Sequence, residues 1–126
     1  MTQENKELLL KELSSRYPYE VILHFDDKVE QDDEPLYNIR KNGGKYLIND
    51  AYYLEEVKPY LRSMKSMTSD EWLEYLSLKE SIVAADGITY NFETFESIDW
   101  LITHHFDYND LIEKGLAIEA PEEIYN

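Results

Sequence analysis

The spacing of apolar residues predicts a helix at the start of the chain, over residues 3–15. Its apolar face consists of leucines that recur at helical spacing, with one tyrosine beyond them: Leu9, Leu10, Leu13 and Tyr17. Thr2 stands where an N-cap side chain would accept a hydrogen bond from the first unpaired amides. Pro18 follows the segment and ends it, because the residue before a proline resists the helical conformation.

Alternating apolar and polar residues at positions 20–25 predict a strand. One face of this strand would carry Val21, Leu23 and Phe25. Residues 26–35 are rich in Asp and Glu, which favours an acidic loop, with a short edge strand as the alternative.

A hairpin is predicted next, with strands at residues 36–41 and 45–49. Asn42-Gly43-Gly44 lies between them, and these residues readily adopt the positive φ angles of tight hairpin turns. Residues 52–61 then predict a short helical turn that Pro59 interrupts.

The strongest helical pattern covers residues 68–85. Thr68 and Glu71 match a capping box, in which each side chain accepts a bond from the backbone amide of the other residue. The apolar stripe of this helix comprises Trp72, Tyr75, Leu76 and Val83. Asp86-Gly87 would end the helix with a residue in the left-handed conformation.

Asp86-Gly87 also supports a second interpretation of the same region. It can form the turn of a hairpin between residues 81–85 and residues 88–92. The helix is the favoured interpretation, the hairpin remains the alternative, and residues 88–92 read as a strand.

Two more helices are predicted around a pair of adjacent histidines, over residues 97–105 and 108–114. Asp107 is placed as the N-cap of the second helix, where its carboxylate would accept bonds from unpaired amides. His104 and His105 fall at the end of the first helix, where a partial positive charge suits the helix dipole.

Together these segments predict a single α+β domain over residues 1–126. A small antiparallel sheet at about residues 20–49, which a strand at 88–92 could extend, would pack against the N-terminal helix and three to four C-terminal helices. A chain of 126 residues can bury a core without disulfides, and this chain contains no cysteine.

The charge of the chain is strongly negative and unevenly distributed. There are 27 acidic and 12 basic residues, for a formal net charge of −15. Residues 1–34 contain 10 acidic and 4 basic residues, residues 35–67 contain 3 and 6, and residues 68–126 contain 14 and 2. Because acidic surfaces repel phosphate, direct nucleic-acid binding is not expected. The hydrophobic fraction of 43% argues against disorder.

The sequence also bears on location. Its first residues lack the basic region, apolar run and cleavage site of a signal peptide. No apolar run approaches the ~18 residues that a membrane span needs. We therefore expect a cytoplasmic protein that does not bind membranes.

Metal binding is the first chemistry to consider. His104, His105 and Asp107 are weak candidates for metal ligands, because adjacent residues on a helix project about 100° apart, whereas zinc-binding histidines usually lie four residues apart. Residues 26–35 lack the glycine and the regular alternation of a calcium loop. We predict no metal and no cofactor.

Enzyme chemistry has little support in the sequence. There is no Gly-x-Ser-x-Gly elbow, no P-loop and no Gly-x-Gly-x-x-Gly motif. Pairs of carboxylates are common, but an acidic chain produces them by chance. A small enzyme or metal-binding protein is therefore the third hypothesis.

Protein binding is the function that the composition favours. The chain has 11 tyrosines and two tryptophans, which are residue types that interfaces favour. The weak candidates for partner contacts lie in the basic middle of the chain: Tyr52, Tyr53, Tyr60 and Arg62. Opposite charges of the middle and the ends could also pair between copies in a homo-oligomer. The alternative function is an acidic DNA mimic that inhibits a host nucleic-acid-binding enzyme.

Three segments together resemble a known group of sequences: "MTQENKELLLKELSSRYPY" at 1–19, "YYLEEVKPYLRSMKSMT" at 52–68 and "WLITHHFDYNDLIEKGLAIEAPEEIY" at 100–125. The group consists of small uncharacterised acidic proteins encoded in phages, prophages and integrated elements of gut bacteria. Its members often carry Arg-Gly where Asn109 and Asp110 stand here. The resemblance carries over no activity and no functional residues. It implies a mobile-element setting and hence an accessory protein directed at a host partner.

Overall fold

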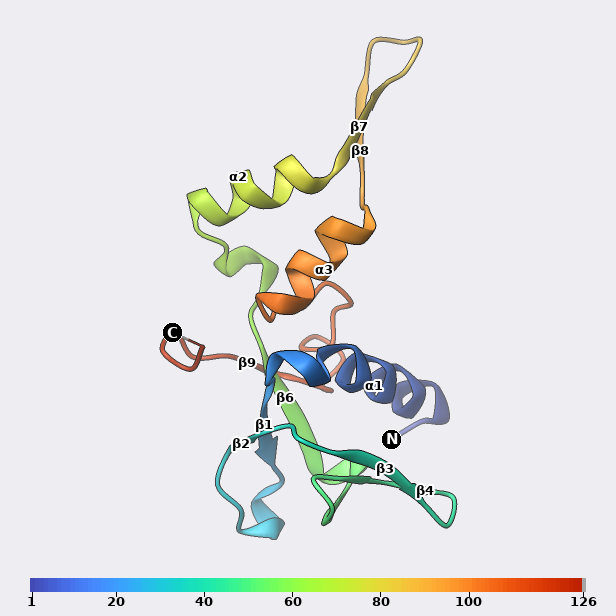
Figure 1. The fold of residues 1–126 in the computed structure, drawn as a ribbon, viewed down its shortest axis with the longest axis vertical. Helices are drawn as coiled ribbons and strands as arrows, with labels where there is room; N and C mark the ends of the chain where they lie inside the picture. The colour runs from blue at the N-terminus through green and yellow to red at the C-terminus, as the bar shows by residue number, and fades with distance from the viewer. Residues whose placement is uncertain (126) are drawn as a thin grey trace.

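The computed structural model describes residues 1–125 and has an elongated shape (Figure 1). It combines helices with several small sheets, so the predicted mixture of α and β structure is confirmed. The α-helices are α1 (Gln3–Arg16), α2 (Ser69–Leu78) and α3 (Phe95–Thr103). A broad body containing α1 and most strands occupies one end, the α2–α3 pair lies in the middle, and a hairpin projects at the other end.

The strands of residues 1–125 form three sheets. The first has the order β2-β1-β6-β9, the second β3-β4-β5, and the third is the hairpin β7-β8. Their bounds are β1 (Ile22–Phe25), β2 (Glu34–Pro35), β3 (Ile39–Asn42), β4 (Lys45–Ile48), β5 (Tyr52–Tyr53), β6 (Val57–Leu61), β7 (Glu80–Val83), β8 (Thr89–Phe92) and β9 (Ile118–Glu119). The β6–β9 pair is parallel, whereas the other paired strands are antiparallel.

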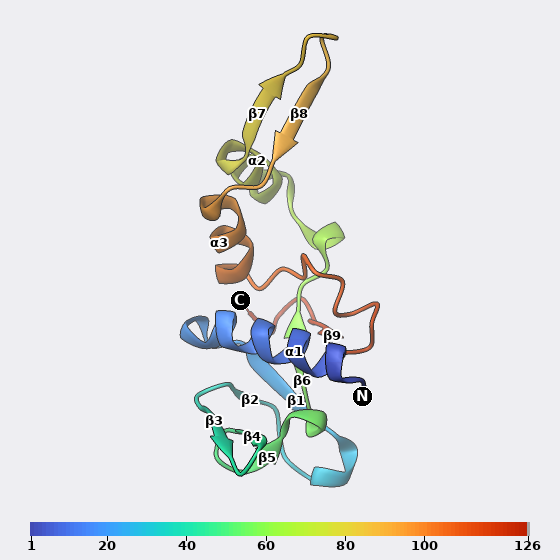
Figure 2. The same ribbon diagram turned by 90° about the vertical axis from the view of Figure 1, so that its right-hand side faces the viewer.

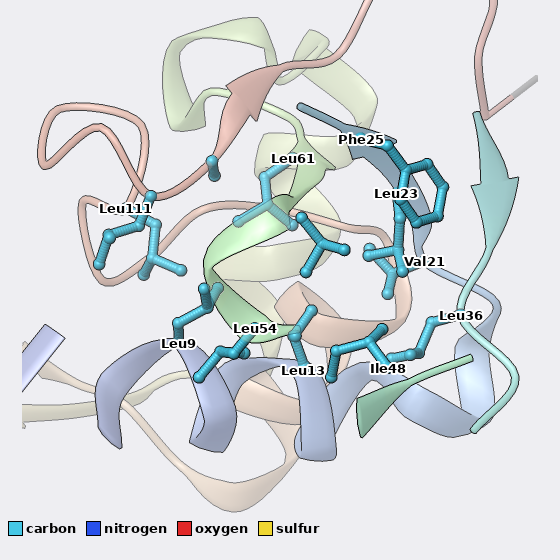
Figure 3. Close-up of a cluster of buried hydrophobic side chains, with 13 residues drawn as sticks. Leu9, Leu13, Val21, Leu23, Phe25, Leu36, Ile48, Leu54, Leu61 and Leu111 are labelled. Carbon is cyan, nitrogen blue, oxygen red and sulfur yellow. The ribbon is translucent and has the colours of Figure 1, made fainter. Parts of the chain in front are cut away.

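Helix α1 packs across the strands of the body, as the view in Figure 2 shows. The Thr2 hydroxyl accepts a bond from the Asn5 amide, so the predicted N-cap is confirmed. Leu9 and Leu13 are fully buried against the strands (Figure 3). The predicted inward face of the first strand is also buried and comprises Val21, Leu23 and Phe25. This face meets the leucines of α1, and the contact forms the larger hydrophobic core.

A tyrosine from the C-terminal segment bridges β1 and β6 where these strands separate. Pro59 of β6 lies opposite Leu23 and has no amide proton to donate. One residue further along, the Tyr125 hydroxyl accepts a bond from the Ile22 amide at 2.9 Å and donates to the Tyr60 carbonyl at 2.6 Å. A side-chain hydroxyl therefore stands between two backbone groups that an unbroken ladder would pair directly.

A smaller hydrophobic cluster joins α2 to α3. Its buried members are Tyr75, Trp100, Leu101 and Phe106. The Thr68–Glu71 capping box begins α2 as predicted, and Thr94 caps α3 in the same way with Ser97. The predicted helix at 97–105 is thus present as α3, with its start shifted to Phe95 because Thr94 supplies the cap.

The favoured helix over residues 68–85 is wrong beyond Leu78. Lys79 has extended backbone angles, and the Thr94 hydroxyl donates to the Leu78 carbonyl at 2.7 Å. The alternative hairpin is the observed structure, with Asp86-Gly87 in the turn and Gly87 at φ 83°. The residues that form it are mostly β-branched or aromatic, and these types favour strands over helices. The strand near 88–92 pairs with β7 and with no strand of residues 20–49. The single sheet predicted for residues 20–49 is also wrong, because β1 and β2 belong to the first sheet and β3 and β4 to the second.

Residues 52–61 form strands β5 and β6 around a short turn at 54–56, not the predicted helical turn. Residues 108–114 form turns and not a helix, because Asp110 adopts a positive φ of 57° that no helix continues through. Two α-helices therefore follow the sheet region within residues 1–125, where three to four were predicted.

The boundaries of the first sheet also differ in detail from the prediction. Strand β1 begins at Ile22 and not at residue 20, because Glu20 lies in the left-handed region at φ 56°. The alternative edge strand in the acidic loop is present as β2. None of the helices within residues 1–125 has both the length and the apolar character that crossing a membrane requires.

Candidate protein-binding surface

The histidines and the aspartate at 104–107 point to separate neighbours. Both carboxylate oxygens of Asp107 accept backbone bonds of 2.9 Å, one from the Leu111 amide and one from the Ile112 amide. The His104 ring stacks on Trp100 with centroids 4.2 Å apart. Within residues 1–125, no group of three or more His, Asp or Glu side chains could hold a metal ion.

His105 has the most unusual environment of the three. Its ring stacks on Tyr125, with centroids 3.7 Å apart and an interplanar angle of 10°. Burial, together with the neighbouring Arg16, His104 and Arg62 side chains, lowers the pKa of His105 to about 4. At neutral pH this imidazole is therefore uncharged and serves as a flat packing surface for Tyr125.

A buried ion pair connects α1 to the same corner of the chain. Arg16 is fully buried, lies 3.0 Å from Glu12 and donates to the Phe106 carbonyl at 2.7 Å. Asn109 donates to the other carboxylate oxygen of Glu12. These contacts hold the 104–112 segment against α1, so this polar cluster supports the fold.

All four tyrosine and arginine candidates make contacts within the fold. The Tyr52 hydroxyl donates to Gln31 at 2.8 Å, and the Tyr60 hydroxyl donates to Asp33 at 2.9 Å. Burial and the bond to Asp33 raise the pKa of Tyr60 to about 12. Arg62 forms two 2.7 Å bonds with the Glu71 carboxylate. Tyr53 is 45% exposed, with the Lys45 ammonium 5.0 Å from its ring centroid.

The projecting hairpin, residues 80–92, offers a different surface, and we call it the arm. Every residue of β7 and β8 is exposed. The register pairs Ile82 with Tyr90 and Glu80 with Phe92, so these side chains lie on one face. Alternation along β8 places Ile88 on that face as well. The four apolar residues of this face, Ile82, Ile88, Tyr90 and Phe92, are each about half exposed.

The other face of the arm is mainly polar. It carries Ser81 and Val83 opposite Asn91 and Thr89, and the Ser81 hydroxyl donates to the Asn91 side chain at 2.6 Å. The arm is therefore an amphipathic ribbon. The arm projects beyond α2 and α3 in Figures 1 and 2, which leaves the side chains of its apolar face about half exposed.

The base of the arm is held firmly by polar contacts with α2 and α3. Glu93 directly follows β8, and its carboxylate accepts bonds from the Tyr75 and Ser97 hydroxyls. Lys79, which directly precedes β7, lies 3.4 Å from the same carboxylate. Burial and the bond to Glu93 raise the pKa of Tyr75, which keeps its hydroxyl protonated as a donor. The arm therefore leaves the α2–α3 pair in a defined direction.

Further apolar side chains are exposed beside this base. Phe95, in the first turn of α3, is 94% exposed, and Leu73 of α2 is 65% exposed. An open groove of about 540 Å³ adjoins Phe95, lined by Glu93, Thr94, Phe95, Ile98, Asp99 and Ile102. Exposed apolar side chains thus occur on α2 and α3 as well as on the arm.

The prediction from sequence missed this surface because it favoured the helix. The signal was present in the alternation of residues 88–92 and in the β-branched Ile82 and Val83 on the other side of Asp86-Gly87. In the helical interpretation, Val83 belonged to a buried stripe. In the hairpin it lies on the arm and is 69% exposed.

Comparisons of the chain with protein-family models, with curated proteins and with solved structures found no match.

Proposed function

We propose that this chain is a protein-binding module and that the arm is its main binding element. The observation that carries the proposal is an unpaired apolar face on a firmly held, projecting ribbon. A two-stranded hairpin gains little stability on its own. Contiguous exposed apolar surface on a soluble fold is typical of interaction sites.

The shape of the arm also suits protein recognition. Both outer edges of a two-stranded ribbon present backbone amides and carbonyls that a strand of another protein can pair with. Tyr90 and Phe92 supply the large, flat side chains that dominate binding energy in many interfaces. The arm thus combines apolar anchors with backbone groups that fix their register.

The DNA-mimic hypothesis rests on the total charge of the chain. Imitating a phosphate backbone requires regularly spaced carboxylates, whereas the arm, which projects from the fold, presents an apolar face. That difference favours the protein-binding module. The proposed setting in a phage or integrated element remains a prediction from the resemblance, and so does cytoplasmic location.

Site-specific crosslinking tests the proposed function. Photoreactive benzoylphenylalanine replaces Tyr90 on the arm in one variant and Tyr37, which is 55% exposed on the body, in the other. In lysate of the source cells, we expect position 90 to crosslink a defined protein and position 37 not to do so. The crosslinked protein is then purified, and its Kd for the chain is measured by calorimetry.

Paired variants make the test specific for the apolar face. I82T/Y90T replaces two apolar-face residues with good strand formers, and we expect Kd to rise by about tenfold or more. S81T/V83T changes the opposite face, and we expect less than about a twofold effect. Equal effects of the two pairs, or no specific crosslink from position 90, would contradict the proposed function.

A further inference from the structure

We infer that the surface which receives the arm is an apolar cleft bordered by Lys and Arg side chains on another protein. This inference rests on the proposed function and adds the chemistry of the partner. It is carried by the carboxylates that surround the apolar face.

The arm and the start of α3 form an acidic segment without any positive charge. Residues 80–99 contain five carboxylates and no Lys, Arg or His: Glu80, Asp86, Glu93, Glu96 and Asp99. Glu93 is occupied by Tyr75, Ser97 and Lys79, and the Tyr19 hydroxyl donates to Asp99. Asp86 lies in the turn at the tip and accepts a bond from the Ile88 amide at 2.9 Å.

The two remaining carboxylates have no internal partner. Within residues 1–125, the side chains of Glu80 and Glu96 make no hydrogen bond or ion pair. Glu80 lies on the apolar face opposite Phe92, at the base of the arm, whereas Asp86 lies at its tip. Carboxylates therefore stand at both ends of the apolar strip.

Burial of the apolar strip would bring these carboxylates close to the partner. A carboxylate removed from water without a positive partner is costly, so a neutral or acidic cleft would be disfavoured. Lys or Arg side chains at the border of the cleft would offset that cost and give the contact its orientation.

The same charges argue against a second copy of this chain as the occupant. Two arms packed face to face would bring like charges together from segments that contain no base, in molecules that each carry a net charge of −15. A basic-bordered cleft, in contrast, would attract this chain over distances comparable to the Debye length.

Chromatography on defined resins tests this inference without the natural partner. The probe is a resin that carries both phenyl and quaternary ammonium groups, and resins with either group alone serve as references. E80Q/E96Q removes the two carboxylates near the apolar strip. E4Q/E113Q is the matched control, because it also adds two to the net charge of −15 and also changes one residue in the first turn of a helix.

On the mixed resin, we expect E80Q/E96Q to be retained about threefold less than E4Q/E113Q. I82T/Y90T should show the same loss of retention on the mixed resin. On the ammonium resin, E80Q/E96Q and E4Q/E113Q should be retained equally. Equal retention of both charge variants on the mixed resin would overturn the inference while leaving the crosslinking test of the arm unaffected. Arm-dependent dimers in sedimentation equilibrium, lost in I82T/Y90T, would also overturn it, because the occupant would then be a second copy.

Discussion

The side chain of His105 connects the corner at 104–107 to the end of the described chain. It adopts a positive φ of 65° and stacks on Tyr125, whose hydroxyl bridges β1 and β6. Because His105 is neutral in the folded state, its protonation favours the unfolded state. The stability that the neutral ring contributes is therefore complete above pH 6.5 and is lost as the pH falls toward about 4.

This behaviour predicts a defined pH dependence. In wild-type protein, the free energy of unfolding should fall by on the order of 1 kcal/mol per pH unit between pH 6.5 and 4 because of His105. His105→Phe keeps a flat ring and should reduce the slope by about that amount. Urea unfolding at several pH values measures it.

Tyr125→Phe is the matched control for the pH effect. It keeps the stacked ring but leaves the Ile22 amide and the Tyr60 carbonyl without their shared partner. We expect it to lower stability by about 1–3 kcal/mol at every pH and to leave the slope unchanged. An unchanged slope in His105→Phe would refute the assignment to this histidine.

Sequence reasoning at the residue scale succeeded where the contact was local. It predicted that the Asp107 carboxylate accepts hydrogen bonds from backbone amides a few positions away. The donors are the amides of Leu111 and Ile112, which lie in a turn and not in the first turn of a helix. The stacking of His105 on Tyr125 joins residues from different parts of the fold, and no local pattern reports such a contact.

In the arm, the choice between a helix and a hairpin decides both the type of element and whether a binding surface is exposed. The Thr68–Glu71 capping box begins a helix in residues 68–85, but only the spacing of apolar residues predicted that this helix continues to residue 85. The helix ends at Leu78 because the Thr94 hydroxyl occupies its final carbonyl, and Thr94 is 16 positions away. The caps of α1 and α2 were predictable, whereas this tertiary end was not.

At the scale of the element, the contribution of the arm to the free energy of unfolding is expected to be small. Neither hydrophobic cluster includes a residue of the arm. We expect replacement of residues 80–92 by a short Gly-Asn-Gly turn to change the free energy of unfolding by less than about 1 kcal/mol. Thermal unfolding followed by circular dichroism measures the change.

A large loss of stability in that variant would mean that the arm is part of the folded core. In that case its exposed face would have a structural role, and the proposed function would lose its main support. The Glu93 and Thr94 contacts remain in the variant, so loss of the base of the arm cannot explain such a result.

At the scale of the whole molecule, Arg62 connects the two hydrophobic clusters. Its backbone pairs with His105 and Asp107, and its guanidinium lies 4.1 Å from the Phe106 ring centroid. The hydrogen bonds from Arg62 lower the pKa of Glu71 to about 2, so this pair persists well into acid. The contact ties β6 of the larger core to the start of α2.

Removing this connection should uncouple the α2–α3 pair from the body. We expect Arg62→Met to lower stability by about 1–3 kcal/mol, because the Glu71 carboxylate loses both of its Arg62 bonds. Hydrogen exchange should accelerate in α2 more than in β1.

Arg40→Met provides the comparison. Arg40 lies 3.1 Å from Asp50, but both side chains are at least half exposed, so the expected loss is below about 0.5 kcal/mol. Uniform acceleration of exchange over the whole chain in Arg62→Met would show that the two clusters unfold as one cooperative unit.

The bridge formed by Tyr125 has a consequence for how the protein is made. The Ile22 amide and the Tyr125 hydroxyl that it contacts are 103 positions apart, and β9 joins the sheet only through residues near the end of the described chain. During synthesis, the early strands therefore emerge from the ribosome long before the segment that completes them. Until residue 125 has emerged, these strand edges stay open, and open strand edges are able to pair with other nascent chains.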